Sequence, residues 1–255
     1  MKNLLRKLHL IPNQRAEREK RSAEKARRNL TVPNARRSYA DYLASLLAKK
    51  HPETAMSLAV GGDYEVMGEA LRQRLVRFGL QPDNYLIDVG CGSGRLAFAC
   101  ARSDFRDTLR YLGVDIVPEM LAFAAEKCRQ PRWRFELVTD PRIPENDEVA
   151  DMVCFFSVFT HLMEEESFLY LREARRVLRP GGRIVASYLD IAMPAHWEIF
   201  EANVQSARWR QEKPMDIFLS AAFFETWAAR LELDLIEDRA PDCGQRTCVL
   251  QKSRA

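Results

Sequence analysis

Three glycines on alternate positions and two aspartates mark the part of the chain with the clearest capacity for chemistry. Gly90, Gly92 and Gly94 follow a short apolar run and precede a stretch of helix formers, and Asp88 lies two residues before the first glycine. Glycines let a ligand approach the backbone closely, and the start of a helix offers free N–H groups. Asp115 ends the next predicted strand, where a carboxylate can accept hydrogen bonds from both hydroxyls of a ribose. These residues predict a site for a nucleoside or nucleotide.

The spacing of the glycines distinguishes this loop from that of dinucleotide enzymes. The chain has G-x-G-x-G where those enzymes have G-x-G-x-x-G, and an acidic strand end is a poor neighbour for a 2′-phosphate. The alternative left open by the loop alone is an α/β domain whose glycine turn is purely structural.

The elements around the loop alternate between predicted strands and helices, which is the pattern of a parallel α/β sheet. The predicted strands cover residues 85–87, 111–115, 134–138, 150–156, 183–188, 233–236 and 247–250, with the last two as a closing pair. The predicted helices cover residues 38–50, 65–78, 95–101, 119–128, 164–178 and 221–231. Residues 179–182, Arg-Pro-Gly-Gly, are predicted to be a turn that leads into the fifth strand.

Four motifs in order along the chain resemble those of the class I S-adenosylmethionine (SAM) dependent methyltransferases. They are Asp-Val-Gly-Cys-Gly-Ser-Gly (88–94), Gly-Val-Asp-Ile-Val-Pro-Glu-Met-Leu (113–121), Ser-Val-Phe-Thr-His-Leu (157–162) and Arg-Val-Leu-Arg-Pro-Gly-Gly (176–182). The resemblance extends over about residues 61–252. It implies a Rossmann-like α/β sheet of seven strands in the order 3-2-1-4-5-7-6, with the last strand antiparallel, and SAM as the cofactor of a methyltransferase.

The resemblance also implies which residues hold that cofactor. Asp88 is expected to orient the methionyl ammonium, directly or through water, Asp115 to bind the ribose, and Asp140 to meet the adenine amino group. The full set of expected cofactor residues is Tyr64, Asp88, Gly90, Cys91, Gly92, Gly94, Asp115, Ile116, Thr139, Asp140 and Ser157. Two of them have structural alternatives. Asp140 precedes Pro141 and is also placed to cap a turn, and Tyr64 is also placed to pack in the core behind an N-cap formed by Asp63.

Two histidines are the candidates for a catalytic base. Methyl transfer from a sulfonium is an in-line displacement for which the protein mainly supplies position and desolvation, and a base is needed only when the acceptor must lose a proton. His161 follows the fourth strand, at the edge where open α/β sheets bind ligands, and is the first candidate. His196 is the second. The alternative interpretation is that each histidine only caps or packs.

The core motifs leave the methyl acceptor open. The first hypothesis is a hydroxyl on a sugar, a lipid-linked glycan or another small metabolite, because the 61–64, 157–162 and 244–247 segments look like those of bacterial small-molecule or glycan methyltransferases. The second is a lipid or quinone-type acceptor. Protein and RNA come third, because no Asn/Asp-Pro-Pro-Tyr/Phe motif follows the fourth strand. A hypothesis from another class is a non-catalytic SAM-binding scaffold that recruits a partner.

Composition predicts a globular cytoplasmic protein. The chain has 255 residues, 47% of them hydrophobic and 29% charged, and no apolar run approaches the ~20 residues that span a bilayer. No secretory signal is evident at the start of the sequence. The six cysteines form no C-x-x-C pair, which predicts a reducing compartment and no metal site.

The sequence divides into a basic arm (residues 1–37, helical or disordered), a helical lead-in (38–60) and the predicted methyltransferase domain (61–255). Within the domain, residues 189–220 interrupt the alternation of elements and are rich in aromatic residues, which predicts a lid or an insertion on the substrate side. Twelve Lys or Arg and three Glu give the arm a net charge of +9. Because the whole chain has a net charge of +3, the other 218 residues have a net charge of −6.

The arm begins with apolar residues at helical spacing. Its first interpretation is the solvated or self-associating tail, and its second is peripheral contact of residues 1–30 with an anionic surface such as the inner membrane. A nucleic-acid contact and an organellar transit peptide are the other interpretations. The mildly acidic body disfavours nucleic acid as a partner.

Overall fold

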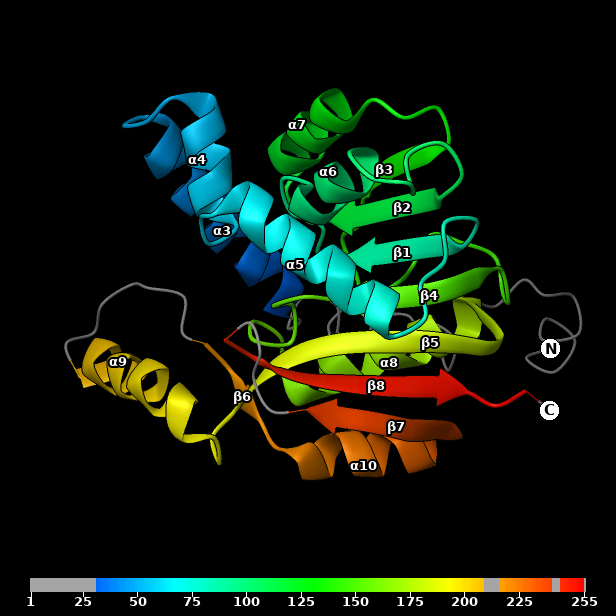
Figure 1. Cartoon of the computed structure of the whole chain (residues 1–255). Helices are drawn as coiled ribbons and strands as arrows, with labels where there is room; N and C mark the ends of the chain where they lie inside the picture. The colour runs from blue at the N-terminus through cyan, green and yellow to red at the C-terminus, as the bar shows by residue number, and fades with distance from the viewer. Residues whose placement is uncertain (1–30, 209–215, 240–243, 255) are drawn as a thin grey trace, which may run out of the picture.

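The protein is described by a computed structural model that covers residues 31–208, 216–239 and 244–254. The predictions for residues 1–30 lie outside this part of the chain. Within it, a twisted sheet runs through the molecule in the order β3-β2-β1-β4-β5-β8-β7 (Figure 1). Its strands are β1 (Tyr85–Val89), β2 (Arg110–Asp115), β3 (Trp133–Leu137), β4 (Ala150–Phe155), β5 (Leu178–Asp190), β7 (Leu233–Arg239) and β8 (Arg246–Lys252).

The strand directions confirm the predicted sheet. Neighbouring strands from β3 to β5 are parallel, and β8 is antiparallel both to β5 and to β7. Counted without the short strand β6 (Phe218–Leu219), this order is the predicted 3-2-1-4-5-7-6. Strand β6, which the sequence analysis did not predict, pairs with the end of β5 beside the main path.

Helices cover both faces of the sheet (Figure 1). They are α3 (Thr31–Leu47), α4 (Pro52–Ala59), α5 (Tyr64–Arg77), α6 (Arg95–Ala101), α7 (Pro118–Cys128), α8 (Glu164–Val177), α9 (Trp197–Arg208) and α10 (Ala221–Arg230), with a 3-10 turn at Pro194–His196. Because side chains alternate across a strand, β1 contributes Ile87 to a core with α8 and α10, and Leu86 to a core with α5 and α6. None of the described helices is long and apolar enough to cross a bilayer.

The first two described helices lie over the carboxyl ends of the strands rather than on a face of the sheet. Leu43 of α3 and Met56 of α4 are buried in a separate cluster with Val117 and Met120, at the start of α7. Helix α3 begins at Thr31, seven residues before the predicted helix.

The predicted turn at residues 179–182 is wrong, because these residues belong to β5. Strand β5 begins at Leu178, which pairs with Ala150, and the pairing resumes with Met152 opposite Arg183. The Arg-Pro-Gly-Gly segment is therefore a bulge inside a strand that is paired on both sides of it.

The stretch predicted as an insertion contains α9 and β6. No residue of α9 is buried, and 52% of the Trp197 surface and 45% of the Val204 surface are exposed. The two residues of β6 pair with the last two residues of β5 (Leu189 with Phe218, Asp190 with Leu219). The segment between them, of which the structure describes residues 191–208, 216 and 217, therefore leaves β5 and returns beside it.

Candidate functional site

The glycine loop between β1 and α6 has a backbone that only glycine accommodates. Gly90 and Gly94 have φ angles of +72° and +82°, in the left-handed region. A Cβ at Gly90 would lie 2.4 Å from a methyl carbon of Val158, and one at Gly94 would lie 2.7 Å from the Cβ of Ala124. The loop is thus held tightly between the segment after β4 and helix α7.

Asp88 lies beneath this loop with only 3% of its surface exposed. The hydroxyl of Tyr111 donates a hydrogen bond of 2.6 Å to Oδ2, and the thiol of Cys154 donates to Oδ1 over 3.4 Å. Burial raises the pKa of Asp88 to about 6, although both hydrogen bonds act in the opposite direction. Tyr111 and Cys154 were not predicted as site residues. The alternation of side chains along a strand could have identified them, because both occupy strand positions that face the same side of the sheet as Asp88.

Asp115 fixes the loop from the side of β2. Its Oδ2 accepts the N–H of Gly92 (2.8 Å) and its Oδ1 accepts the N–H of Val117 (2.9 Å), while 8% of the residue is exposed. Burial raises the pKa of this carboxyl, and the backbone donors oppose that effect. Each carboxylate oxygen has a second lone pair, so Asp115 retains acceptor capacity toward a ligand. The neighbouring Ile116 packs against the cluster beneath α3 and α4.

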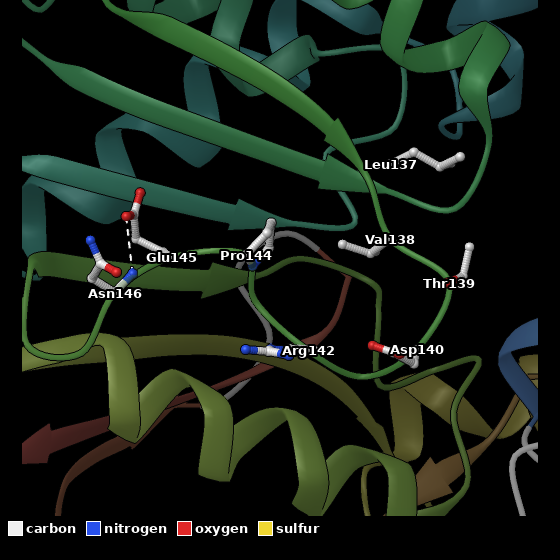
Figure 2. Close-up of a pocket in the computed structure, with 8 residues that line it drawn as sticks. All are labelled: Leu137, Val138, Thr139, Asp140, Arg142, Pro144, Glu145 and Asn146. Carbon is white, nitrogen blue, oxygen red and sulfur yellow. Dashed lines mark hydrogen bonds between the residues drawn. The ribbon is translucent and has the colours of Figure 1, made fainter. Parts of the chain in front are cut away.

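A cavity of about 450 Å³ lies along the connection from β3 to β4 (Figure 2). It is lined by Leu137, Val138, Thr139, Asp140, Arg142, Pro144, Glu145 and Asn146. Thr139 and Asp140 therefore line the same cavity. Figure 2 shows both on the part of the loop next to the carboxyl end of β3.

Ser157, directly after β4, is held in a strained conformation by a polar network. Its φ of +60° is unusual for a residue other than glycine, and strain of this kind costs about 1–3 kcal/mol and concentrates at functional sites. Its N–H donates to Ser187 Oγ (2.8 Å), and the Ser187 hydroxyl donates to the side-chain oxygen Oε1 of Gln245 (2.7 Å). Gln245 Nε2 donates back to Ser157 Oγ (3.0 Å). The sequence analysis named neither Ser187 nor Gln245 as a site residue.

Comparison with known proteins identifies the central part of the chain. A family model described as a methyltransferase domain matches residues 87–186, which hold the glycine loop, Asp115 and the strained Ser157. The chain carries a class I SAM-dependent methyltransferase domain. The match and the sheet order together confirm the resemblance seen in the four motifs.

Curated relatives of this methyltransferase domain are named as methyltransferases of different compounds. Demethylmenaquinone methyltransferase of Tropheryma whipplei is 31% identical over 110 residues, 42% of either chain. 27-O-demethylrifamycin SV methyltransferase of Amycolatopsis mediterranei is 26% identical over 173 residues, 66% of this chain and 60% of the relative. The chain thus spans less than two thirds of the length of these relatives.

Solved structures share the fold at low sequence identity. The pyocyanin biosynthetic protein PhzM superposes with a TM-score of 0.60 at 16% identity, covering 83% of this chain and 62% of that one. Magnesium protoporphyrin IX methyltransferase from Synechocystis, solved with S-adenosylhomocysteine, gives 0.58 at 15% identity, covering 78% and 87%. At such identities the likeness establishes the fold alone.

His161 lies at the rim of the methyltransferase domain, in the turn that follows β4. Its Nδ1 is 3.9 Å from Oδ1 of Asp216, and its ring packs edge-on against Tyr39 with centroids 5.2 Å apart. One quarter of the side chain (25%) is exposed. Burial lowers the pKa of His161 and the charge of Asp216 partly offsets this, so the imidazole is neutral at pH 7. Tyr39 and Asp216 were not predicted as site residues.

His196, the second candidate base, has a placement that fits a structural role and argues against the predicted catalytic one. Its side chain is fully buried, and Nδ1 lies 2.9 Å from the backbone nitrogen of Asp190. Its Nε2 is buried without a hydrogen-bond partner among the described residues. The neighbouring Asp190 forms an ion pair with Arg246 (2.6 Å). A fully enclosed imidazole cannot reach an acceptor without local opening, which favours the packing interpretation of this histidine.

Tyr64 and Cys91 support the glycine loop. The Tyr64 hydroxyl donates to the carbonyl of Ser93 (2.7 Å), and its ring packs against Phe98. Asp63 is the N-cap residue of α5, but its side chain makes no capping bond, so the capping part of the alternative interpretation is wrong. Cys91 is buried, and burial raises the pKa of its thiol, which disfavours the reactive thiolate.

Proposed function

We propose that this chain is a SAM-dependent methyltransferase that transfers the methyl group to a hydroxyl of a small molecule or glycan. The observation that carries the choice of a hydroxyl is His161, a neutral and partly exposed imidazole at the rim where ligands of α/β sheets bind. A hydroxyl must lose its proton during attack, and a neutral imidazole is the side chain best suited to accept it near pH 7.

The residues of the loop fit the cofactor. Gly90 and Gly94 give the loop a left-handed backbone next to the start of α6, whose first N–H groups are available to a ligand, and two buried carboxylates, Asp88 and Asp115, flank it. In this proposal Asp88 faces the positively charged methionyl end and Asp115 faces the ribose hydroxyls. Thr139 and Asp140, with their shared cavity, support an adenine site on the β3 side.

The cofactor supplies an activated methyl group on a sulfonium, and the chain supplies position and proton transfer. His161 takes the acceptor's hydroxyl proton as an oxygen lone pair forms the bond to the methyl carbon, and the electrons of the broken carbon–sulfur bond stay on sulfur. Helices α3 and α4, packed over the start of α7, exclude water from this edge of the sheet. In this proposal the described part of the insertion, residues 189–208 and 216–220, lies on the substrate side.

The relatives support a small-molecule acceptor, because one is named as a methyltransferase of a rifamycin. The test is calorimetric titration with SAM and S-adenosylhomocysteine, followed by incubation of bacterial cell-envelope extracts with methyl-labelled SAM. Label in a polar small-molecule or glycan fraction is the expected result. Binding without any label would instead support the non-catalytic scaffold, and absence of binding would refute the proposal.

A lipid or quinone-type acceptor is the second candidate. It is supported by the similarity to demethylmenaquinone methyltransferase and by α9, which exposes the apolar side chains of Trp197 and Val204. Such an acceptor would suit contact of the basic arm with an anionic membrane, in a cytoplasmic enzyme that is peripheral to the inner membrane. Label in the lipid fraction of the same experiment would favour this candidate over the first.

A further inference from the structure

Three segments that are far apart in the sequence meet at His161. Tyr39 comes from α3, His161 from the turn after β4, and Asp216 from the chain between α9 and β6. Among the described residues, the charged group beside the imidazole is the carboxylate of Asp216, whose Oδ1 lies 3.9 Å from Nδ1. This distance is longer than a hydrogen bond, and catalytic contacts in ligand-free proteins are often long until a substrate tightens them.

The backbone of Asp216 is fixed on both sides. Asn203 of α9 donates from Nδ2 to the carbonyl of Asp216 (2.7 Å) and accepts the N–H of Asp216 at Oδ1 (3.3 Å). The next residue, Ile217, donates its N–H to the carbonyl of Thr160, directly before His161 (2.8 Å). The insertion is thereby attached to the turn that carries the histidine.

We propose that Asp216 is a positioning residue that orients the imidazole of His161 and stabilises its protonated form during methyl transfer. This inference rests on the proposed function, in which His161 takes the acceptor proton. With Nδ1–H directed at the carboxylate, Nε2 is left as the proton acceptor. The carboxylate then stabilises the imidazolium as it forms, in the same sense as the acid of a catalytic triad.

The electrostatics of the surrounding elements agree with this role. Burial lowers the pKa of His161, and Asp216 acts against it. Tyr39 is the titratable group that faces the ring from α3, and burial raises its pKa, so it remains an uncharged phenol at neutral pH. Asp115 of β2 acts on Tyr39 but not detectably on His161. Removing the carboxylate of Asp216 should therefore lower the pKa of His161.

The experiment follows the ring signals of His161 by NMR across a pH titration of the full chain. The chain has four histidines, so His161→Gln assigns the signal. In Asp216→Asn we expect the pKa of His161 to fall by about one pH unit, the lower end of what an adjacent opposite charge produces. Asp83→Asn, at an exposed position before β1, is the matched control and should leave the titration unchanged.

Kinetics give the second measurement, once an acceptor is labelled. In Asp216→Asn we expect the plateau of kcat to fall roughly 10-fold, because a weaker base accepts the proton less readily. We also expect the acidic limb of the pH profile to move to lower pH, together with the pKa of His161. Asp216→Glu should restore most of the plateau. A lower plateau with an unmoved limb, or an unmoved His161 titration, would overturn the inference. Failure of SAM to bind would overturn the proposed function instead, and the NMR titration would still decide whether Asp216 acts on His161.

Discussion

The side of the molecule proposed to bind the cofactor and the side proposed to bind the acceptor, called below the cofactor side and the acceptor side, are built in different ways. On the cofactor side, Asp88 and Asp115 come from adjacent strands within one short stretch of chain, are nearly fully buried and are bonded to neighbours at 2.6–2.9 Å. On the acceptor side, Tyr39, His161 and Asp216 come from three distant segments, and His161 and Asp216 stand 3.9 Å apart. Many methyltransferases can share a cofactor side that one short stretch of chain builds. An acceptor side that separate segments assemble can differ between methyltransferases with different acceptors.

The sharpest test of the cofactor side is Asp115→Ala. The change removes the proposed acceptor for the ribose hydroxyls and leaves the N–H groups of Gly92 and Val117 unpaired, each loss being worth about 1–3 kcal/mol. We expect SAM binding to be abolished in calorimetry. Asp115→Asn, which keeps the shape, controls for folding by circular dichroism. Micromolar affinity in Asp115→Ala would refute the assignment to the ribose.

On the acceptor side, His161→Gln should reduce kcat about 10²-fold or more while the Kd for SAM stays the same, because a base acts on the acceptor alone. The matched change is His196→Gln. This variant should keep kcat per folded molecule and lose about 1–3 kcal/mol of unfolding free energy, since it disturbs a buried hydrogen bond. Equal kcat losses in the two variants would remove the distinction drawn between the histidines.

The buried carboxyl of Asp88 makes the cofactor side sensitive to pH. Its pKa of about 6 in the folded protein lies above the ordinary value of 3.8, so the folded state binds the proton more tightly than the unfolded state. This group therefore stabilises the fold fully below pH ~4, and the contribution is lost as the pH rises through 6. Relative to Asp88→Asn, the wild type should lose about 3 kcal/mol between pH 4 and 7 in urea unfolding. A difference that does not change with pH would contradict the shift.

Gly94→Ala probes how tightly the cofactor side is packed. The new Cβ would lie 2.7 Å from that of Ala124 at a φ of +82°, so we expect a loss of about 1–3 kcal/mol of unfolding free energy and weaker SAM binding. Gly244→Ala, also at positive φ but with open space around it, is the control for the backbone strain alone. Equal destabilisation in both variants would show that the contact with α7 contributes nothing.

The smallest effect on the cofactor side should come from deleting residues 1–30. We expect unchanged affinity for SAM and weaker sedimentation with anionic liposomes, because the arm carries the positive charge of the chain and the cofactor carboxylates lie in the body. Uncharged liposomes are the control. Unchanged sedimentation with anionic liposomes would remove the membrane hypothesis.

The sequence predicted the parts of the molecule whose signals are local. The glycine loop and Asp115 follow from short motifs in which a few residues determine the backbone. The strand order was predicted from the resemblance of those motifs to the methyltransferase family, and the observed sheet has that order. The bulge at residues 179–182 was mistaken for a turn, because Pro-Gly-Gly has the same local preference in both and only the pairing of Leu178 with Ala150 distinguishes them.

The acceptor side was predicted only in part, because its contacts are tertiary. His161 was found from its place after the fourth strand. Asp216 has no local signal, since its role depends on the bonds that Asn203 and Thr160 make to its segment. The converse applies to His196, because the sequence of an aromatic insertion does not show that the fold encloses this side chain.

The return of the chain through β6 has a consequence for how this domain can be changed. Strand β6 holds Phe218 opposite Leu189, so the segment that carries α9 starts and finishes at one place on the sheet. The free-energy cost of closing such a loop, which comes from lost chain entropy, rises by only about 0.6 kcal/mol for each doubling of its length. Lengthening, shortening or exchanging the segment should therefore leave the sheet folded, provided that its last residues, Asp216 among them, are kept. It is the natural place to graft a new acceptor preference onto an unchanged cofactor site.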